Sequence, residues 1–255
     1  MTSKNQIWSP KLYNDKHAFV YSYGKDLIEL LDPKPHERIL DLGCGSGQLT
    51  YEISRLAKEV LGVDKSVEMI ADARSKFPDI HFDTADAANF KFQEQFDAIF
   101  SNATLHWVKD YQAAAKSMFE NLKSGGRIVL EFGAKGNVQT IVNQLKESLR
   151  SYDYHEAAET EPWYFPSIGE YASALEQEGF KVAQAQHFKR LTELADQNSG
   201  IIDWLSMFAG CFFKGIATVE RQKICQNVQE NLKKSCLKDG KWYADYQRIR
   251  VIGFK

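Results

Sequence analysis

Short apolar runs alternate with amphipathic segments through the first half of the chain. The runs predict buried strands at Arg38–Leu42, Val60–Val63, Ile80–Phe82, Phe96–Phe100 and Arg127–Phe132. Helical periodicity lies between them, over Gln48–Ala57, Val67–Lys76 and Tyr111–Leu122. Strands that alternate with helices predict a parallel sheet with helices on both faces. Runs as short and apolar as these are typical of strands that are buried on both sides.

The second half has longer helical patterns and fewer strand candidates. Helices are expected at Val138–Arg150, Ile168–Gly179 and Ile201–Lys234, and strands at Phe180–Lys189 and Trp242–Phe254. Before the first strand, Tyr13–Leu31 has a helical pattern that two prolines end. We expect one compact domain with three parts: an N-terminal helical cap (1–35), a ligand-binding core (36–136), and the rest of the sheet with a helical insertion (137–255).

Composition narrows the class of protein. The 255 residues are 44% hydrophobic and 26% charged, which suits a globular enzyme. The 32 Lys and Arg nearly balance the 34 Asp and Glu, which gives no reason to expect a nucleic-acid partner. No apolar run reaches the roughly 18 residues of a membrane span, and the N-terminus lacks the apolar core of a signal peptide. The four cysteines form no CxxC pair, so we expect reduced thiols, no metal site and a cytoplasmic location.

Three alternating glycines follow the first strand directly, in the stretch ILDLGCGSGQLT (Ile39–Thr50). Gly43, Gly45 and Gly47 lie between a strand and a helix, where residues without side chains allow tight turning and close approach of a ligand. The helix that follows points free N–H groups toward the crevice at the carboxyl ends of the strands. The stretch therefore predicts a ligand site at this edge of the sheet.

The spacing of the loop distinguishes two classes of ligand. Dinucleotide sites have G-x-G-x-x-G, whereas this loop has G-x-G-x-G. Asp41 lies two residues before the first glycine, where an acid is unfavourable beside a pyrophosphate but suits a cation. S-adenosylmethionine has no phosphate, and Asp41 could face its ammonium while helix N–H groups hold its carboxylate. Cys44 is expected to contribute its backbone only.

Two further acids follow the next strands. Asp64 could accept hydrogen bonds from both ribose hydroxyls, although dehydrogenases use the same device and the residue could also cap a helix. Asp86 could accept from the adenine amino group, with the backbone N–H of Ala87 serving a ring nitrogen, or it could be an ordinary turn residue.

Four segments together resemble the class I S-adenosylmethionine-dependent methyltransferases: ILDLGCGSG, VLGVDKSVEMI, DTADAANF and FDAIFSNATLHWV. Trp8–Tyr13 and Ile201–Trp204 (IIDW) extend the resemblance to the trans-aconitate 2-methyltransferase group, over nearly the whole chain. The SNAxLHW pattern is shared with biotin- and quinone-pathway methyltransferases. The resemblance implies a doubly wound, mostly parallel seven-stranded sheet of Rossmann-like type, with a helical lid inserted before the last strand.

The resemblance also implies roles for single residues. The three glycines would bind the methionine end, Asn102 its amino group, Asp64 the ribose, and Asp86 with Ala87 the adenine. Trp8 and Tyr13 would close over the cofactor. One departure concerns the segment after IIDW: the group often carries an arginine suited to carboxylates there, whereas this chain has Gly210–Lys214 (GCFFK). That departure weighs against a tricarboxylate acceptor.

His106, just beyond the fourth strand, is the candidate catalytic residue. A phenol or alcohol acceptor would gain about 10²–10⁴-fold from a base there, whereas a carboxylate is already ionised and needs none. The ring could also simply pack beside Trp107. We expect Trp107, Trp163 and Lys214 to contact the acceptor.

Other residues bear on the acceptor site less directly. The segments around Trp163 and Ile201–Lys214 are candidate lids. Arg248 or Arg250 could pair with an anionic substrate if either faces inward.

These observations predict a methyltransferase that acts on an oxygen of a small molecule, which could be a carboxylic acid. We expect a monomer or weak dimer with no nucleic-acid or membrane partner, although the fold would also suit a lipid substrate. The alternatives are a nicotinamide-dependent oxidoreductase and a non-catalytic module that binds S-adenosylmethionine.

Overall fold

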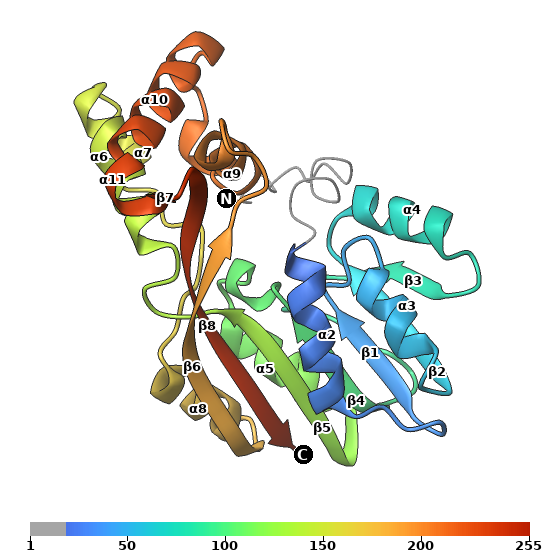
Figure 1. Cartoon of the computed structure of the whole chain (residues 1–255). Coiled ribbons are helices and arrows are strands. Elements are labelled where there is room, and N and C mark those ends of the chain that lie inside the picture. The colour runs from blue at the N-terminus through green and yellow to red at the C-terminus, as the bar shows by residue number, and fades with distance from the viewer. Residues whose placement is uncertain (1–18) are drawn as a thin grey trace. The chain divides into compact units, whose positions relative to one another are not determined.

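The computed structural model of the chain describes residues 19–255 (Figure 1). The predicted contributions of Trp8 and Tyr13 to the cofactor site therefore lie outside the described residues. Contacts divide the chain into two compact units. The larger one contains residues 19–135, 163–188 and 248–255, and the smaller one contains the described residues 136–162 and 189–247.

The larger unit is built on a mostly parallel sheet. Its strands follow the order β3-β2-β1-β4-β5-β8-β6, and β8 runs antiparallel to β5. This arrangement confirms the predicted doubly wound fold. The order changes direction at β1 and β4, which pair directly although β2 and β3 come between them in the sequence. Ligands of such sheets bind outside the carboxyl ends of the strands at this point. The strands are β1 (Arg38–Leu42), β2 (Glu59–Asp64), β3 (His81–Thr84), β4 (Phe96–Asn102), β5 (Leu122–Gly133), β6 (Lys181–Glu193) and β8 (Lys241–Phe254).

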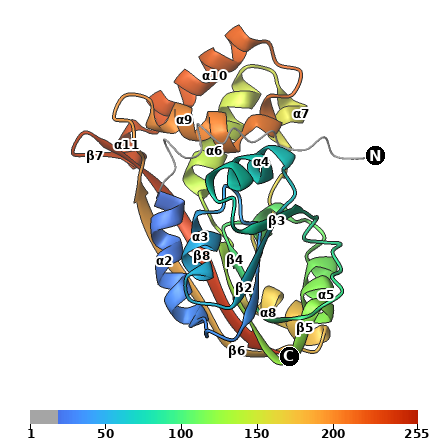
Figure 2. The ribbon, with the colours of Figure 1, turned by 90° about the vertical axis from the view of Figure 1, so that its right-hand side faces the viewer.

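Helices cover both faces of this sheet. In Figure 2, α2 (Phe19–Leu31) lies on one side of the strands and α5 (Tyr111–Asn121) on the other. Successive residues of one strand serve opposite faces: Ile39 packs in the cluster that contains Leu27 of α2, whereas Leu40 packs in the cluster that contains Met118 of α5. The other helices of this unit are α3 (Gln48–Ser54), α4 (Val67–Lys76), α8 (Ile168–Gln177) and the short 3₁₀ helix η1 (Leu105–Trp107).

The smaller unit is mainly helical. Its helices α6 and α10 pack side by side, and α10 also contacts α9 (Figure 1). Residues 241–247 of β8 also belong to this unit, and Thr140 at the start of α6 is fixed to them, because its backbone N–H and its hydroxyl both donate to Asp245 Oδ2, at 3.0 and 2.7 Å. The elements of this unit are α6 (Gln139–Ser151), α7 (His155–Ala158), α9 (Gly200–Phe208), η2 (Gly210–Phe213), α10 (Thr218–Asn231), α11 (Lys233–Cys236) and β7 (Leu237–Lys238).

The predicted elements within residues 19–255 are confirmed, with changes at their ends, and residues 13–18 of the predicted helix Tyr13–Leu31 lie outside the described residues. The run Ile201–Lys234 is broken into α9, η2, α10 and α11, as its glycines indicate, and these elements lie between β6 and β8. η1, α7 and β7 were not predicted, because each has at most four residues and no measurable period. The predicted division at residues 35 and 136 stays a prediction.

An ion pair joins the start of β1 to β5. Arg127 binds both carboxylate oxygens of Glu37 at 2.6 and 2.8 Å and donates from Nε to the carbonyl of Leu31 at 2.8 Å. Both side chains are largely buried. Burial by itself raises the pKa of Glu37, but the hydrogen bonds from Arg127 and from the backbone N–H of Lys34 lower it overall.

We predict that Glu37→Gln lowers the free energy of unfolding by about 1–3 kcal/mol at pH 7, because a guanidinium loses its charged partner. Because the pKa of Glu37 is lowered by folding, its contribution is present above the ordinary value of 4.5 and is lost as the pH falls below it. The difference between wild type and variant in urea denaturation should therefore shrink at low pH. The exposed Glu29→Gln is the control and should match wild type.

Candidate functional site

The glycine loop is held by the backbone of the neighbouring strand. The carbonyl of Val63 accepts from the N–H groups of Gly43 and Cys44, at 2.7 and 2.9 Å. Gly43, Gly45 and Gly47 all have positive φ, at 82°, 54° and 83°. Left-handed backbone favours glycine, so the local geometry accounts for all three.

Among the residues that the structure describes, only Gly45 of these glycines has open space in front of it. A Cβ on Gly43 would lie 2.1 Å from the side chain of Thr104, and one on Gly47 would lie 2.7 Å from Phe82. A Cβ on Gly45 would meet no described atom within 4 Å. Packing within the protein therefore requires Gly43 and Gly47 to lack side chains, whereas Gly45 leaves a bare stretch of backbone that a ligand can approach. This arrangement fits the methionine end of S-adenosylmethionine.

Asp41 lies beneath the loop and is almost completely buried. Its Oδ2 accepts a 2.6 Å hydrogen bond from the hydroxyl of Thr50 on α3. Burial raises the pKa of Asp41 to about 7, and the nearby Asp64 adds to the increase while the Thr50 hydroxyl opposes it. A buried carboxyl group of this kind becomes fully ionised when a cation comes near. The predicted role beside an ammonium group is compatible with this position and stays a prediction.

Asp64 ends β2 and connects it to the glycine loop. Its Oδ2 accepts from the backbone N–H of Gly45 at 3.0 Å, and its Oδ1 accepts from that of Ser66 at 2.9 Å. Burial raises the pKa of Asp64 even though these N–H groups oppose the shift. The N-cap of α4 is Ser66, whose hydroxyl accepts from Met69 N–H. The cap that we considered for Asp64 is thus made by its neighbour, and ribose binding stays its predicted role.

Asp86 forms a turn and an ion pair. Its Oδ1 accepts from Ala88 N–H at 3.0 Å, and its Oδ2 lies 2.7 Å from the ammonium of Lys65. Burial by itself raises the pKa of Asp86, but the contacts with Lys65 and Ala88 lower it overall. Ala87, the predicted adenine contact, is buried in the same turn. Lys65 was not singled out in the sequence, where it follows Asp64 with no pattern that marks it.

The chain turns sharply after β4. Asn102 is buried and pairs in register with Glu131 of β5. Ala103 has a φ of 58°, a left-handed conformation that is uncommon for alanine, and its N–H donates to the carbonyl of Glu131 at 2.7 Å. The hydroxyl of Thr104 then donates to the carbonyl of Gly43 at 3.1 Å. This turn, whose contact to the loop the sequence could not reveal, brings the end of β4 against the glycine loop.

His106 is buried, with 8% of its surface exposed. Its Nδ1 accepts from the backbone N–H of Gly133 at 3.4 Å, so a neutral ring carries its proton on Nε2. Burial holds the pKa of His106 well below its usual range, and the positive charge of Arg248 lowers it further. The ring is therefore neutral at pH 7, and its Nε2 is a hydrogen-bond donor.

Aromatic rings surround His106. Its ring centroid lies 5.5 Å from that of Trp107 and 5.7 Å from that of Phe165. Trp163 contacts both of these rings, edge-on to Trp107 at 5.7 Å and stacked on Phe165 at 5.6 Å. A backbone hydrogen bond of 2.8 Å from Tyr164 N–H to the carbonyl of His106 fixes the two segments together. The structure thus brings together the predicted residues His106, Trp107 and Trp163.

A buried charged cluster lies on β5 and β8. Glu131 has no exposed surface, and both Arg248 and Arg250 bind its carboxylate. The two arginines were considered in the sequence, but Glu131 was missed. An acid inside the apolar run IVLEF was the signal that could have found it.

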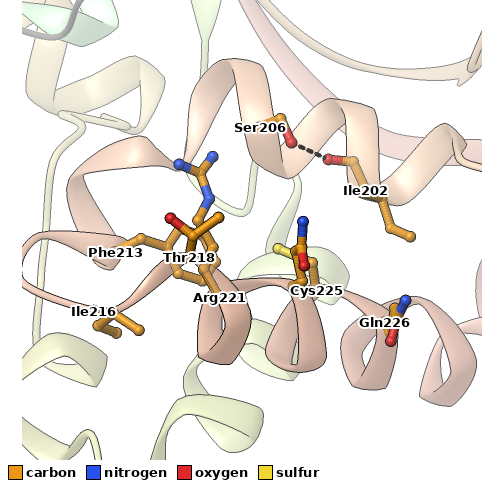
Figure 3. Close-up of a pocket in the computed structure, with 9 residues that line it drawn as sticks. Ile202, Ser206, Phe213, Ile216, Thr218, Arg221, Cys225 and Gln226 are labelled. Atoms are coloured by element: carbon orange, nitrogen blue, oxygen red, sulfur yellow. Dashed lines mark hydrogen bonds between the residues drawn. The ribbon is translucent and has the colours of Figure 1, made fainter.

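Lys214 is exposed in the smaller unit, so its predicted contact with the acceptor stays a prediction. That unit also contains a cavity of about 580 Å³ between α9, η2 and α10 (Figure 3). Its lining mixes apolar and polar side chains, among them Phe213, Arg221 and Cys225. The guanidinium of Arg221 lies 5.0 Å from the centre of the Phe213 ring. Of the residues predicted for the cofactor, those that the structure describes do not line this cavity.

Residues 19–255 contain neither a membrane-spanning helix nor a cluster of metal-binding side chains. None of the helices there combines the length and the apolar character that crossing a membrane requires. No group of three or more histidine, cysteine, aspartate or glutamate side chains is placed there to hold a metal ion.

Comparisons with known proteins agree with this geometry. The methyltransferase domain family matches residues 33–196. An uncharacterized methyltransferase of Schizosaccharomyces pombe is 32% identical over 260 residues, which cover 97% of this chain and 98% of that protein. A trans-aconitate 2-methyltransferase of Escherichia coli is 35% identical over 129 residues, about half of each chain. The structure of an S-adenosylmethionine-dependent methyltransferase from Mesorhizobium loti superposes with a TM-score of 0.55 at 20% identity, covering 91% of this chain and 96% of that one.

The fold and the bare glycine loop are those of a class I methyltransferase that uses S-adenosylmethionine. The chain belongs to the methyltransferase domain family. The alternatives of a nicotinamide-dependent oxidoreductase and of a non-catalytic binding module are therefore set aside.

We predict that Gly45→Ala weakens the binding of S-adenosylhomocysteine by about tenfold or more, a loss of about 1.4 kcal/mol. The new methyl group meets no atom of residues 19–255, so its cost to folding is that of alanine in left-handed backbone, about 1 kcal/mol, and the melting temperature should fall only slightly. Gly43→Ala is the comparison, and its clash with Thr104 should destabilise the fold itself. Calorimetric titration and thermal melts measure both effects. Unchanged affinity in Gly45→Ala would contradict the assignment of the loop.

We also predict that Asp41 makes the protein less stable as the pH rises. Its pKa is raised from 3.8 to about 7 by folding, so its favourable contribution is present below pH 4 and is lost as the pH rises through 7. A shift of this size corresponds to about 4 kcal/mol at most. In urea denaturation without cofactor, Asp41→Asn should gain stability relative to wild type between pH 4 and pH 8. A difference that does not change with pH would show that Asp41 is ionised throughout.

Proposed function

We propose that this methyltransferase transfers the methyl group to a carboxylate oxygen of a small molecule. The observation that carries the proposal is the state of His106. Because its Nδ1 accepts from Gly133 N–H, its proton is on Nε2, where a general base would need a lone pair. The low pKa of the buried ring adds to this argument, since the ring is a poor proton acceptor.

A site without a base favours a nucleophile that is ionised beforehand. Carboxylic acids have pKa values near 4, so they are carboxylates at pH 7, whereas phenols and alcohols would have to lose a proton. When bound, S-adenosylmethionine supplies an electrophilic methyl group on its sulfonium. The residues of this chain then have to align the acceptor with that methyl group, and good alignment alone can contribute about 7–11 kcal/mol.

His106 is well suited to hold such an acceptor. An Nε2–H donor can bind one carboxylate oxygen and leave the other to react, which fixes the orientation of the nucleophile. The rings of Trp107 and Phe165 pack against His106, with Trp163 packed against both of them, and only 8% of the His106 surface is exposed to water. In this proposal His106 is a substrate-binding donor, which replaces the role of a base that the sequence suggested as one possibility.

The relatives support a carboxylic acid acceptor. Proteins named trans-aconitate 2-methyltransferase match about half of this chain. We infer that this protein also takes a small carboxylic acid, and trans-aconitate is a natural first compound to test.

The test is to incubate the protein with labelled S-adenosylmethionine and a panel of acids, phenols and amines. We expect transfer to at least one acid, recovered as a methyl ester that releases methanol in mild alkali. At saturating cofactor, the rate should be independent of pH between about 6 and 8.5, because the acceptor is ionised throughout and the buried His106 stays neutral in this range. Label that enters only phenols or amines would contradict the proposal.

Two substitutions separate the donor role from the base role. His106→Gln keeps an N–H donor and should retain most activity, whereas His106→Leu should lower kcat/KM roughly tenfold or more, the effect of losing one hydrogen bond to a charged group. If His106 were a base, both variants would lose activity equally. The wild-type rate would also decrease as the pH falls below the pKa of the ring, because the protonated ring cannot accept a proton.

A further inference from the structure

Two arginines share one buried carboxylate at the centre of the larger unit. Glu131 of β5 has no exposed surface, and the side chains of Arg248 and Arg250 on β8 are 7% and 15% exposed. Glu131 pairs with Arg250 and Gly133 with Arg248 across the two antiparallel strands. Alternate residues of a strand lie on the same face, so all three charged side chains lie on one face of the sheet.

The two arginines are not bound equally. Arg250 donates from Nε and Nη2 to Oε2 of Glu131 at 2.9 and 2.6 Å, which are short, charge-assisted contacts. Arg248 donates from Nε to Oε1 at 3.3 Å and from Nη2 to the backbone carbonyl at 3.5 Å, both at the long end of the range. Of the two arginines, Arg250 thus makes the shorter contacts with Glu131, and Arg248 brings a second positive charge into the same buried region.

Arg248 is the arginine that lies next to His106. The residue paired with it, Gly133, donates its N–H to His106 Nδ1. The charge of Arg248 also acts on the His106 ring directly, because it lowers the pKa of that ring. Gly133 is the last residue of β5, so Arg248 lies at the carboxyl edge where the cofactor loop and the end of β4 meet, whereas Arg250 lies two residues further from that edge.

We propose that Arg248 binds the anionic group of the methyl acceptor, and that Glu131 and Arg250 hold its guanidinium in place for this purpose. The inference rests on the proposed function, because it needs an anionic acceptor. It assigns acceptor recognition to the middle of β8, at Arg248, in place of the exposed Lys214. A positive charge in a buried site attracts an anion far more strongly than one in water, and a guanidinium has the fork of donors that matches a carboxylate.

Arg250 is the poorer candidate for this role. Its Nε and Nη2 both donate to one oxygen of Glu131, and its guanidinium lies 5.4 Å from the centre of the Phe188 ring. Removing Arg250 would take away the two short contacts of the buried Glu131 carboxylate, so we expect that change to affect the fold as well as the substrate.

The test measures the binding of simple anions to the protein loaded with S-adenosylhomocysteine. Succinate, benzoate and trans-aconitate are titrated by calorimetry, with the matching amides as neutral controls. At least one acid should bind wild type, and Arg248→Gln should weaken it roughly 10- to 100-fold, the effect of losing a charge-assisted hydrogen bond. Arg248→Lys should restore part of the affinity, and binding of S-adenosylhomocysteine should change less than threefold in both variants.

Arg221→Gln is the matched control. It removes an arginine that lines the cavity of the smaller unit (Figure 3) and should leave anion binding unchanged. With any acid that is also methylated, Arg248→Gln should raise KM while kcat changes much less, because the group binds the acceptor and does not take part in the transfer.

The outcomes separate the two proposals. Equal binding of acids to wild type and Arg248→Gln overturns the inference, as does the failure of wild type to bind any acid of the panel. Loss of S-adenosylhomocysteine binding in both Arg248 variants also overturns it, because Arg248 would then be part of the structure only. Acid binding that depends on Arg248, without formation of any methyl ester, supports the inference and contradicts the proposed function alone.

Discussion

The hydrogen bonds from β2 to the glycine loop are the contacts on which the site depends. One carbonyl, that of Val63, holds two consecutive N–H groups of the loop, and the carboxylate of Asp64 holds a third at Gly45. These bonds keep the loop in a left-handed conformation that exposes bare backbone. The same Asp64 is the predicted ribose ligand, so one side chain both shapes the loop and lies where the nucleoside is expected.

A second set of contacts arranges the acceptor side. The turn after β4 contacts the glycine loop through Thr104 and contacts β5 through Ala103. His106 follows on η1 and is held by Gly133 at the end of β5, next to Arg248. A neutral ring with its proton on Nε2 beside a buried positive charge is an environment for an anion. This is why the account favours a carboxylate over a neutral acceptor that has to be deprotonated.

The sequence predicts well what depends on neighbours along the chain. β1 and α4 have the predicted bounds, because each is an apolar or amphipathic run with clear stops. The glycine loop is recognisable because its spacing is local. β5 begins five residues earlier than predicted, at Leu122. The residues K-S-G-G that follow Leu122 are polar or small and give no apolar pattern, and the pairing of β5 with β4 shifts register in this region.

What could not be predicted depends on contacts between distant strands. The sequence places Asp41 near the loop, but its burial and its bond to Thr50 follow from the packing of α3 on the sheet. The proton position of His106 depends on the N–H of Gly133, which is 27 residues away. The pairing of Glu131 with two arginines more than 110 residues later depends on β8 lying antiparallel beside β5.

The central claim, that His106 is a neutral donor, can be tested most directly by nitrogen-15 NMR of its side chain in the complex with S-adenosylhomocysteine. The account predicts a proton on Nε2 and a bare Nδ1, with shifts that stay constant between pH 6 and pH 8. A ring with its proton on Nδ1, or one that titrates with a pKa near 7, would contradict it.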